Sequence, residues 1–391
     1  MIYPGAVTVV HGMDGARAAR GSVVIIDVFR FSTTVITLLG RGAARVVVAG
    51  DPADLDAMWP RLQSPVVFSE LDLPVEHSDN SPTAARRADL EGGTAVCVSS
   101  NGSRALRAAA DEADEVLVGG FANATALAEY VLATRPSQVT LVAAGLVARG
   151  ERAAEDDVFA ACLQAVLSGK GLELPAFRRQ IVTHPTVQAY MQRAPVEYLQ
   201  DVHVCLTLDA WSVVPRLDSS STPPALISVG GPTAPSRDDG APVTIIRRVR
   251  LPLLPDRVWA ALVEPERRAA WWGRGIELRA QPGGRFSEAW KGSDGARRLT
   301  VGEVWVADPG RRLTLTWADD DWPRDTLLVL DLEECKGETD LILSHSGWEG
   351  LPQGGRDGLI SAHSDGWDEL LRRLRGHLAH SAPQTTERAG K

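Results

Sequence analysis

The sequence predicts two domains of different class: a three-layer αβα domain with a largely parallel sheet, followed by an α+β domain built on antiparallel strands. Before about residue 218, short runs of β-branched and aliphatic residues alternate with helical patterns. Such alternation is typical of βαβ units with helices on both faces of the sheet. After about residue 242, apolar and polar residues alternate with a period of two, which indicates antiparallel strands with one buried face.

The length of 391 residues also favours two domains, because single cores rarely grow beyond about 250–300 residues. A stretch rich in Ser, Pro and Gly separates the two patterns, and such a composition is typical of a linker. The predicted boundaries are 1–218 for the first domain, 219–241 for the linker, 242–380 for the second domain and 381–391 for a polar tail expected to be disordered.

Strands and helices of the first domain are predicted from their apolar runs and the breaks between them. The strands are Val23–Ile26, Arg45–Ala49, Val66–Glu70, Thr94–Val98, Glu115–Val118 and Val139–Ala143. The helices are Thr33–Gly40, Asp51–Leu62, Arg104–Ala113, Ala124–Thr134 and Glu155–Ser168. The near-continuous apolar character of the strands indicates burial on both faces.

In the second domain, Leu313–Trp317 and Leu341–His345 alternate as half-buried strands do. A closing helix is predicted from about 362 to 378, where Trp367, Leu371 and Leu374 recur at helical spacing. Nine of the 11 tryptophans lie after the linker, and for any one of them a place in the core is the simplest interpretation.

Charge and composition exclude several classes of function. The net charge of -9, without a long basic run, argues against a nucleic-acid partner. No run of about 18 apolar residues predicts a membrane span, and the N-terminus lacks the pattern of a secretory signal. The four cysteines are widely spaced, which signals neither a zinc site nor a disulfide framework. We therefore expect a cytoplasmic protein with reduced thiols.

The first buried strand ends in a cluster of polar residues, Asp27, Arg30 and the hydroxyls of Ser32-Thr33-Thr34. Open α/β sheets bind ligands at the carboxyl ends of their strands, and an acid, a base and three hydroxyls suit an anion together with a cation. The same spacing fits a helix N-cap at Ser32 or Thr33 with a local Asp27–Arg30 ion pair. The spacing alone does not separate these two interpretations.

Polar groups recur at the ends of later strands, where a parallel sheet is expected to bring them to one edge. They are Glu70, Asn80-Ser81, Asn101-Gly102-Ser103, Asn123 and Glu155-Asp156. Each alone is explained by a turn or a helix start. Together, carboxylates repel one another unless a divalent cation lies among them, and oxygen ligands suit Mg²⁺ better than zinc. The set predicts metal-assisted phosphoryl transfer or hydrolysis.

Several motifs occur in a fixed order between about residues 20 and 215. They are Asp27-Val28-Phe29-Arg30-Phe31-Ser32-Thr33-Thr34, Asn80-Ser81-Pro82, Ser99-Ser100-Asn101-Gly102-Ser103-Arg104-Ala105-Leu106, Val116-Leu117-Val118-Gly119-Gly120-Phe121-Ala122-Asn123-Ala124, Ala143-Ala144-Gly145 with Ala154-Glu155-Asp156, and Cys205-Leu206-Thr207-Leu208-Asp209 with Val213-Val214-Pro215. In this order they resemble the 2-phosphosulfolactate phosphatase family, Mg²⁺-dependent enzymes of sulfolactate and coenzyme M synthesis.

The resemblance implies a Mg²⁺-dependent phosphatase that acts on a small phosphorylated acid. It implies catalytic roles for Asp27, Glu70 and Glu155, metal ligation by Asp27, Glu155 and Asp156, and phosphate binding by Arg30, Ser32, Asn101, Gly102 and Ser103. One motif departs from the family, since Ser69-Glu70-Leu71-Asp72-Leu73 stands in place of Gly-Glu-Arg-Gly-Gly. If this loop contacts the substrate, specificity or activity differs from that of the family.

The second domain carries a different set of motifs. They are Val258-Trp259-Ala260-Ala261-Leu262, Ala270-Trp271-Trp272-Gly273, Pro282-Gly283-Gly284-Arg285-Phe286, Ser344-His345-Ser346-Gly347-Trp348 and His363-Ser364-Asp365-Gly366-Trp367. They resemble the START-like (SRPBCC) superfamily, in the branch of homologues of the chaperone ATPase activator. The resemblance implies a helix-grip fold, in which a curved sheet and a long helix enclose an apolar cavity for a small hydrophobic molecule. The expected lining is Trp272, Trp290, Trp317, His345 and Trp367.

Two hypotheses follow for the whole chain. In the first, the N-terminal domain is a phosphatase and the C-terminal domain binds a ligand or regulates. In the second, the phosphatase-like domain is an inactive scaffold, and the START-like domain binds a hydrophobic ligand or a chaperone partner. The sequence leaves the oligomeric state open, with a homodimer as one option.

Overall fold

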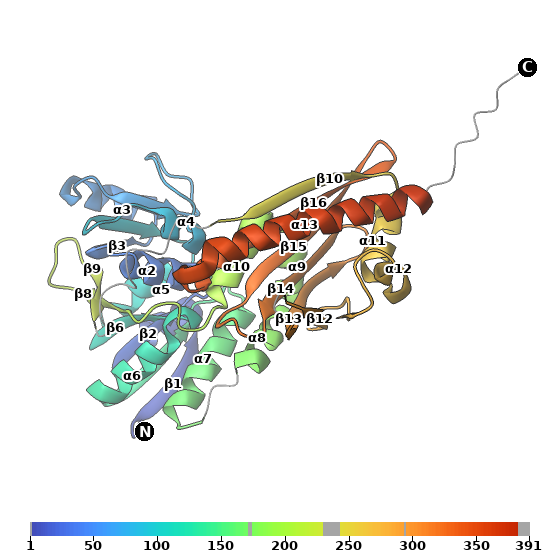
Figure 1. Ribbon diagram of the computed structural model, residues 1–391. Helices are drawn as coiled ribbons and strands as arrows, with labels where there is room; N and C mark the ends of the chain where they lie inside the picture. Colours follow the sequence, from blue (N-terminus) through green and yellow to red (C-terminus); the bar gives the residue numbers. More distant parts are fainter. Residues whose placement is uncertain (1, 171–173, 230–242, 293–294, 382–391) are drawn as a thin grey trace, which may run out of the picture. The chain divides into compact units, whose positions relative to one another are not determined.

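The computed structural model describes the chain except for residues 1, 171–173, 230–242, 293–294 and 382–391. The chain divides into two compact units (Figure 1), one of Met1–Val187 with Glu197–Pro242 and one of Gln188–Val196 with Val243–Lys391. The predicted tail lies outside the described residues, apart from Ser381, with which the last helix ends. Among the described helices, none combines the length and the apolar character needed to cross a membrane.

The first unit is an α/β fold with a nine-stranded, largely parallel sheet, which confirms the predicted class. The strands are β1 (Ala6–His11), β2 (Ser22–Ile26), β3 (Arg45–Ala49), β4 (Val66–Ser69), β5 (Thr94–Val98), β6 (Glu115–Gly119), β7 (Gln138–Ala143), β8 (Val214–Asp218) and β9 (Ala225–Val229). Their order across the sheet is β1-β7-β2-β6-β8-β9-β3-β5-β4. All six strands predicted in this unit are present, β1 and β8 are additional, and residues 227–229, which the sequence leaves open between a short edge strand and no element, are part of β9.

An antiparallel hairpin, β8–β9, lies in the middle of this sheet. The pairings β6–β8, β8–β9 and β9–β3 are all antiparallel, so the parallel block β3-β5-β4 runs opposite to the parallel block β1-β7-β2-β6. The two blocks are therefore not parallel to each other, as the expectation of a single edge assumed, although the loops after β2, β5 and β7 do meet. The hairpin also includes part of the expected linker, because Ala225 and Leu226 are fully buried in the sheet.

Ten α-helices occur in the described part of the first 205 residues, and residues 188–196, which include most of the ninth helix, belong to the second unit. They are α1 (Gly12–Ala18), α2 (Phe31–Gly40), α3 (Pro52–Met58), α4 (Pro82–Arg87), α5 (Gly102–Ala109), α6 (Ala124–Thr134), α7 (Ala154–Leu167), α8 (Leu174–Val182), α9 (Pro185–Arg193) and α10 (Val196–Cys205). Short 3₁₀ turns occur at Trp59–Arg61 and Phe121–Asn123.

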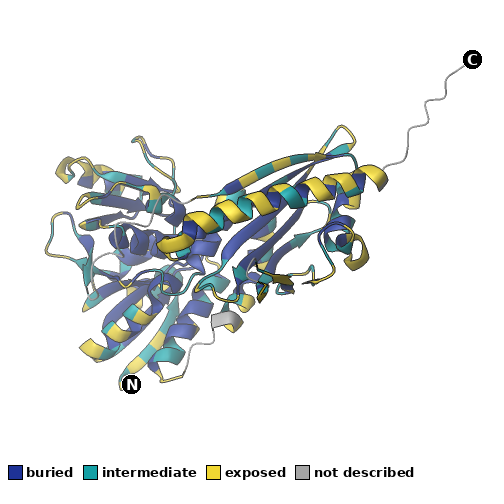
Figure 2. Ribbon diagram, in the orientation of Figure 1, coloured by how far each residue is buried: buried dark blue, intermediate teal, exposed yellow. Residues whose placement is uncertain are grey.

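Helix α2 is the centre of the first unit. All ten of its residues are buried (Figure 2), and it contacts β6 and β8 as well as β3 and β5. The two opposed strand blocks thus both pack on α2. The hydroxyls of Ser32, Thr33 and Thr37 bond to main-chain groups, and Thr37 Oγ1 donates to the Thr33 carbonyl at 2.7 Å. Because α2 begins directly after the Asp27–Arg30 loop, the most buried helix of the unit fixes this loop.

The second unit is a seven-stranded antiparallel sheet with a long C-terminal helix, as predicted. The strands are β10 (Ile245–Leu251), β11 (Ile276–Leu278), β12 (Arg285–Lys291), β13 (Arg297–Asp308), β14 (Arg312–Asp319), β15 (Thr326–Cys335) and β16 (Glu338–Ser346), in the order β10-β16-β15-β14-β13-β12-β11. The helices are α11 (Pro255–Val263), α12 (Pro265–Ala269) and α13 (Gln353–Ser381), with a 3₁₀ turn at Trp348–Gly350. Helix α13 is longer than expected, with non-helical backbone at Gly354 and Gly355.

Candidate active site

The end of β2 meets the start of α5, although the two belong to opposed strand blocks. The Asp27 side chain is 5% exposed, and its Oδ2 accepts a hydrogen bond from the Gly102 amide at 2.7 Å. A Cβ on Gly102 would lie 2.7 Å from this oxygen and 2.3 Å from Phe31 Cδ1. The contact therefore requires glycine at position 102, and it brings the first motif and the Asn101-Gly102-Ser103 motif together as predicted from the sequence.

Asp156, at the start of α7, connects two loops at the ends of β2 and β7. Its Oδ1 accepts from the Val28 amide at 2.8 Å, and its Oδ2 accepts from the Gly145 amide at 2.9 Å. The side chain is 2% exposed, and burial together with neighbouring Asp27 and Glu155 raises its pKa well above the usual range. Both oxygens are engaged by the main chain, so the geometry gives Asp156 a positioning role.

Two further carboxyl groups act electrostatically on Asp27. Burial, together with the charges of Glu70 and Glu155, raises the pKa of Asp27 to about 7 against the opposing effects of the Gly102 amide and Arg30. Burial also raises the pKa of Glu155 to about 7, with a contribution from Asp157. Glu70 Oε1 accepts from the amide and the hydroxyl of Ser100, both at 2.6 Å. The predicted catalytic residues thus form one electrostatically coupled group.

Arg30 is paired with two carboxylates that the sequence motifs did not include. Its guanidinium donates to both oxygens of Asp79, at 2.6 and 3.1 Å, and to Asp201 Oδ2 at 2.9 Å, and it lies 4.5 Å from the ring centre of Tyr198. These partners raise the pKa of Arg30 despite burial. Three hydrogen bonds from the guanidinium are taken by these carboxylates, and phosphate binding by Arg30 stays a prediction.

The helix-cap interpretation of the first motif is also wrong. Helix α2 begins at Phe31, and its N-cap residue, Arg30, makes no side-chain cap bond. The Ser32 hydroxyl instead accepts from the Asp27 amide at 3.0 Å. The hydrogen bond between the Asp27 amide and the Ser32 hydroxyl therefore closes the loop that begins at Asp27.

The other predicted phosphate-binding groups also lie within the loops at this site. Ser103 Oγ accepts from the Ser99 amide and Ser99 Oγ accepts from the Ser103 amide, each at 2.9 Å. Asn101 Oδ1 accepts from the Val147 amide at 2.9 Å. The Asn101 bond joins the loops after β5 and β7. Phosphate binding by Ser32 and by residues 101–103 stays a prediction.

Asp201 and Asp79 are the site residues that sequence reasoning missed. Asp201 is 1% exposed and also accepts from Ser81 Oγ at 2.7 Å and the Thr83 amide at 3.1 Å. Asp79 directly precedes the Asn80-Ser81-Pro82 motif, which was a usable signal. Asp201 lies on α10, 171 residues after Arg30, and no local pattern marks it.

The donor set fits Mg²⁺ only in part. Within the described residues, no three His, Cys, Asp or Glu side chains are arranged to hold a metal ion. Proteins usually bind Mg²⁺ through one or two carboxylates, with waters and substrate phosphates at the other positions. Asp27 and Glu155 supply two such carboxylates, and their raised pKa values mark negative charge that a cation would stabilise.

A cavity of about 320 Å³ opens at the carboxyl ends of β1 and β7, next to the loops that Asp156 connects. Gly145, Val147 and Arg152 line it, together with His11 and Asp157. Asp157 lies 3.2 Å from His11 Nδ1 and accepts from Arg152 Nε at 2.8 Å. This cavity gives solvent and small molecules a place beside the carboxyl cluster.

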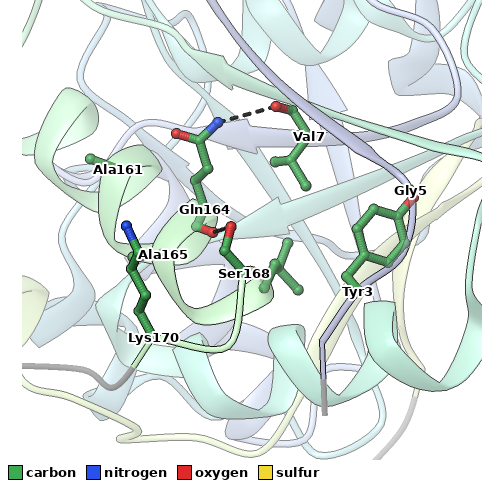
Figure 3. Close-up of a pocket in the computed structure, with 9 residues that line it drawn as sticks. Tyr3, Gly5, Val7, Ala161, Gln164, Ala165, Ser168 and Lys170 are labelled. Atoms are coloured by element: carbon green, nitrogen blue, oxygen red, sulfur yellow. Dashed lines mark hydrogen bonds between the residues drawn. The ribbon is translucent and has the colours of Figure 1, made fainter.

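A second cavity of similar size lies at the opposite end of β1. It is lined by Tyr3, Gly5, Gln164 and Lys170 (Figure 3), at the amino end of β1 and the carboxyl end of α7. Gln164 Nε2 donates to the Val7 carbonyl at 3.1 Å. The coupled carboxyl groups belong to the other end of these elements, so this cavity is not part of the candidate active site.

In the second unit, four of the five expected cavity residues pack against one another. Ring centres lie 6.4 Å apart for Trp272 and Trp317 and 5.3 Å apart for Trp317 and Trp367. His345 accepts from Trp367 Nε1 at 3.1 Å and bonds Thr326 Oγ1 at 2.7 Å, as expected for a structural histidine. Trp290 differs from the other four, because it is 40% exposed to solvent.

The fold and the site together define an α/β enzyme with an acidic centre at strand ends. Residues 9–220 match the family model of 2-phosphosulpholactate phosphatase, and the chain belongs to this family of phosphatases. Residues 253–379 match the model of activator of Hsp90 ATPase homolog 1-like protein. Both resemblances seen in the sequence are thereby confirmed.

Curated relatives agree with the first match. A probable 2-phosphosulfolactate phosphatase of Synechococcus sp. is 28% identical over 227 residues, which cover 52% of this chain and 91% of the relative. One from Thermoplasma volcanium is 28% identical over 208 residues, which cover 52% of this chain and 93% of the relative.

A solved structure from Rhodobacter sphaeroides covers 35% of this chain and 92% of its own, with 28% identity and a TM-score of 0.31.

Proposed function

We propose that the first unit hydrolyses the phosphoester of a small phosphorylated acid, of the kind that 2-phosphosulfolactate represents, and that it requires Mg²⁺. The observation that carries the proposal is the buried Asp27 and the half-buried Glu155, two carboxyls with pKa values of about 7. Perturbed carboxyls of this kind are characteristic of acid–base and metal-binding sites. The names of the curated relatives support the choice of substrate class.

Asp27 and Glu155 are the residues that would hold Mg²⁺. When bound, the ion would neutralise phosphate charge and polarise the phosphoryl group. Asp156 keeps the loops after β2 and β7 together through the Val28 and Gly145 amides. Asp201 and Asp79 hold Arg30, which fixes the loop that carries Asp27.

The charge of the site supports the proposed requirement for a cation. Asp27, Glu70 and Glu155 are coupled, whereas Arg30 is neutralised by Asp79 and Asp201. A phosphorylated acid is itself anionic and would be repelled by this centre. Glu155 is half-buried at the start of α7, and a pKa near 7 allows it to hold or accept a proton at neutral pH.

The test is a screen of the full chain for release of inorganic phosphate from a panel of phosphorylated carboxylic and sulfonic acids, with MgCl₂ and with EDTA. We expect Mg²⁺-dependent release that Asp27→Asn lowers by at least about 100-fold. Asp111→Asn, an exposed carboxylate in the same unit, is the matched control and should keep full activity. Turnover in EDTA, or an unchanged rate in Asp27→Asn, would contradict the proposal.

A second candidate is a scaffold without phosphatase activity, in which the second unit binds a hydrophobic ligand or a chaperone partner. The altered loop after Glu70 favours it, as does the match to an activator of Hsp90 ATPase homologue. Absence of turnover on the whole panel, with a hydrophobic molecule retained in native mass spectrometry of the full chain, would favour the scaffold over the enzyme.

A further inference from the structure

The sheet of the second unit carries a row of polar side chains on the face that packs against α13. Glu288 of β12 pairs directly with Thr300 of β13, and Thr300 pairs directly with Asp319 of β14. Glu288 lies two residues after Phe286, and Asp319 two residues after Trp317, and both aromatic residues belong to the core. Because side chains alternate along a strand, the row shares the core-facing side.

Hydrogen bonds connect this row without balancing its charge. Trp290 Nε1 donates to Thr300 Oγ1 at 3.0 Å, and Thr300 Oγ1 donates to Asp319 Oδ1 at 2.5 Å. Neither Glu288 nor Asp319 forms an ion pair within the described part of the chain. Burial raises the pKa of Glu288 to about 7, with a contribution from Asp319, and burial raises the pKa of Asp319 as well.

Two indole N–H groups beside the row are also left without an acceptor. Trp272 and Trp317 are 9% and 5% exposed, and neither Nε1 meets an acceptor in hydrogen-bond geometry. The Trp272 N–H nevertheless lies close enough to the Glu288 carboxyl to lower its pKa. Buried polar groups without partners each cost about 1–3 kcal/mol and are uncommon unless a ligand or water completes them.

Aromatic residues lie close to the Asp319 end of the row, where the Trp322 amide donates to the Asp319 carbonyl at 3.0 Å and His363 interacts electrostatically with the Asp319 carboxyl. The His363 ring centre lies 5.4 Å from Trp322 and 6.4 Å from Trp317. His363 Nδ1 donates to the Leu359 carbonyl at 2.9 Å when that nitrogen carries the proton, and burial lowers the pKa of the imidazole. His363 is therefore neutral at pH 7 and does not compete as a cation for Asp319.

We propose that the Glu288–Thr300–Asp319 row and the rings of Trp272, Trp317 and Trp322 form a binding site for a small organic cation, an ammonium group that carries methyl or alkyl substituents. The carboxyls supply the charge that such a group requires, and indole faces attract cations through their quadrupole. Trp290 is 40% exposed, and Glu288 is half-buried. Solvent therefore reaches this end of the row.

Other ligands fit this row less well. A purely apolar molecule would remove water from two unpaired carboxyls without replacing it, which is unfavourable. A bare divalent ion would require more oxygen ligands, and the described residues contain no group of three or more potential metal ligands. The exposed neighbour Asp320 adds negative charge near Asp319, whereas Asp321 is paired with Arg298 at 3.2 Å.

The test compares choline with 3,3-dimethylbutan-1-ol, its uncharged carbon isostere, by titration calorimetry and tryptophan fluorescence on the full chain. We expect saturable binding of choline and at least tenfold weaker binding of the isostere. Glu288→Gln and Asp319→Asn should each weaken choline at least tenfold. Glu277→Gln, an exposed glutamate on the adjacent strand β11, is the matched control and should bind as the wild type does.

Two results would overturn the assignment: equal affinity for choline and the isostere, or choline affinity unchanged in both Glu288→Gln and Asp319→Asn. Thermal unfolding of each variant identifies any that fails to fold, and the remaining carboxyl variant then decides the outcome. Asp27→Asn should bind choline normally, since it alters the first unit only. A failed phosphatase assay therefore leaves this test intact.

Discussion

Each unit buries a group of carboxyls, but the surroundings of the two groups differ. In the first unit, main-chain amides of Gly102, Val28 and Gly145 donate to Asp27 and Asp156. In the second, a hydroxyl donates to Asp319, and tryptophans of the core lie next to the row, with Trp317 two residues before Asp319 on the same strand. Amides at loops and helix starts hold an acidic centre rigidly for a metal and a phosphate. Aromatic walls suit a soft organic cation. The raised pKa values of the carboxyls do not by themselves distinguish the two kinds of site.

Removal of one carboxylate from the Arg30 pair should give the largest loss of stability. Asp201→Asn leaves a buried guanidinium short of one partner, and breaking a buried ion pair costs about 3–5 kcal/mol. In the second unit, Asp368→Asn breaks the exposed pair with Arg247, which should cost less than about 1 kcal/mol. Urea unfolding monitored by circular dichroism measures both. Similar losses in the two variants would contradict the buried role of Asp201.

A glycine comparison should give the next largest difference. Gly102→Ala places a Cβ against Phe31 and Asp27, so we expect a loss of about 1–3 kcal/mol, as in an overpacked core. Gly366→Ala on α13 meets nothing within 4 Å, and alanine there should stabilise the helix by about 0.5–1 kcal/mol. The free energies of unfolding of the two variants, measured side by side, should change in opposite directions. An unchanged free energy of unfolding in Gly102→Ala would show that the Asp27 loop moves to accommodate the added Cβ.

The smallest effect concerns pH. The pKa of Glu288 is about 7 in the folded protein and lower in the unfolded chain, so the folded state binds the extra proton. This contribution to stability is present below the unfolded pKa and is lost as pH rises toward 7. Glu288→Gln should therefore flatten the decline of the melting temperature between about pH 4.5 and pH 7, whereas Glu277→Gln should not. A decline as steep as that of the wild type in Glu288→Gln would show that the carboxyl is well solvated.

Local patterns in the sequence predicted much of the fold and the loops of the first site. Apolar runs located β2 to β7, and the motifs at Asp27 and Asn101 marked two loops that do meet. The same patterns missed the β8–β9 hairpin, because a short strand among Ser, Pro and Gly residues gains its burial only from neighbouring strands. They also assumed that all these strands run parallel, which the antiparallel hairpin contradicts, although the loops after β2, β5 and β7 meet as predicted.

Contacts between distant residues were outside the reach of these patterns. Asp201 contacts Arg30 because the fold places α10 next to the start of α2. The spacing of residues along the sequence gives no information about this contact. In the second unit, the Glu288–Thr300–Asp319 row depends on the register of three strands, and a shift by one residue would move each side chain to the opposite face. Trp290 was expected in a cavity for a related reason, because composition does not reveal how far the core extends along β12.

The most direct test of the central claim is a double-mutant comparison of Mg²⁺-dependent phosphate release by Asp27→Asn, Glu155→Gln and the variant with both changes. If the two carboxyls act as one unit, each single change lowers kcat/KM by at least about 100-fold and the second change adds little. Independent effects that multiply, or a single variant with normal turnover, would contradict the assignment of this pair as the active centre.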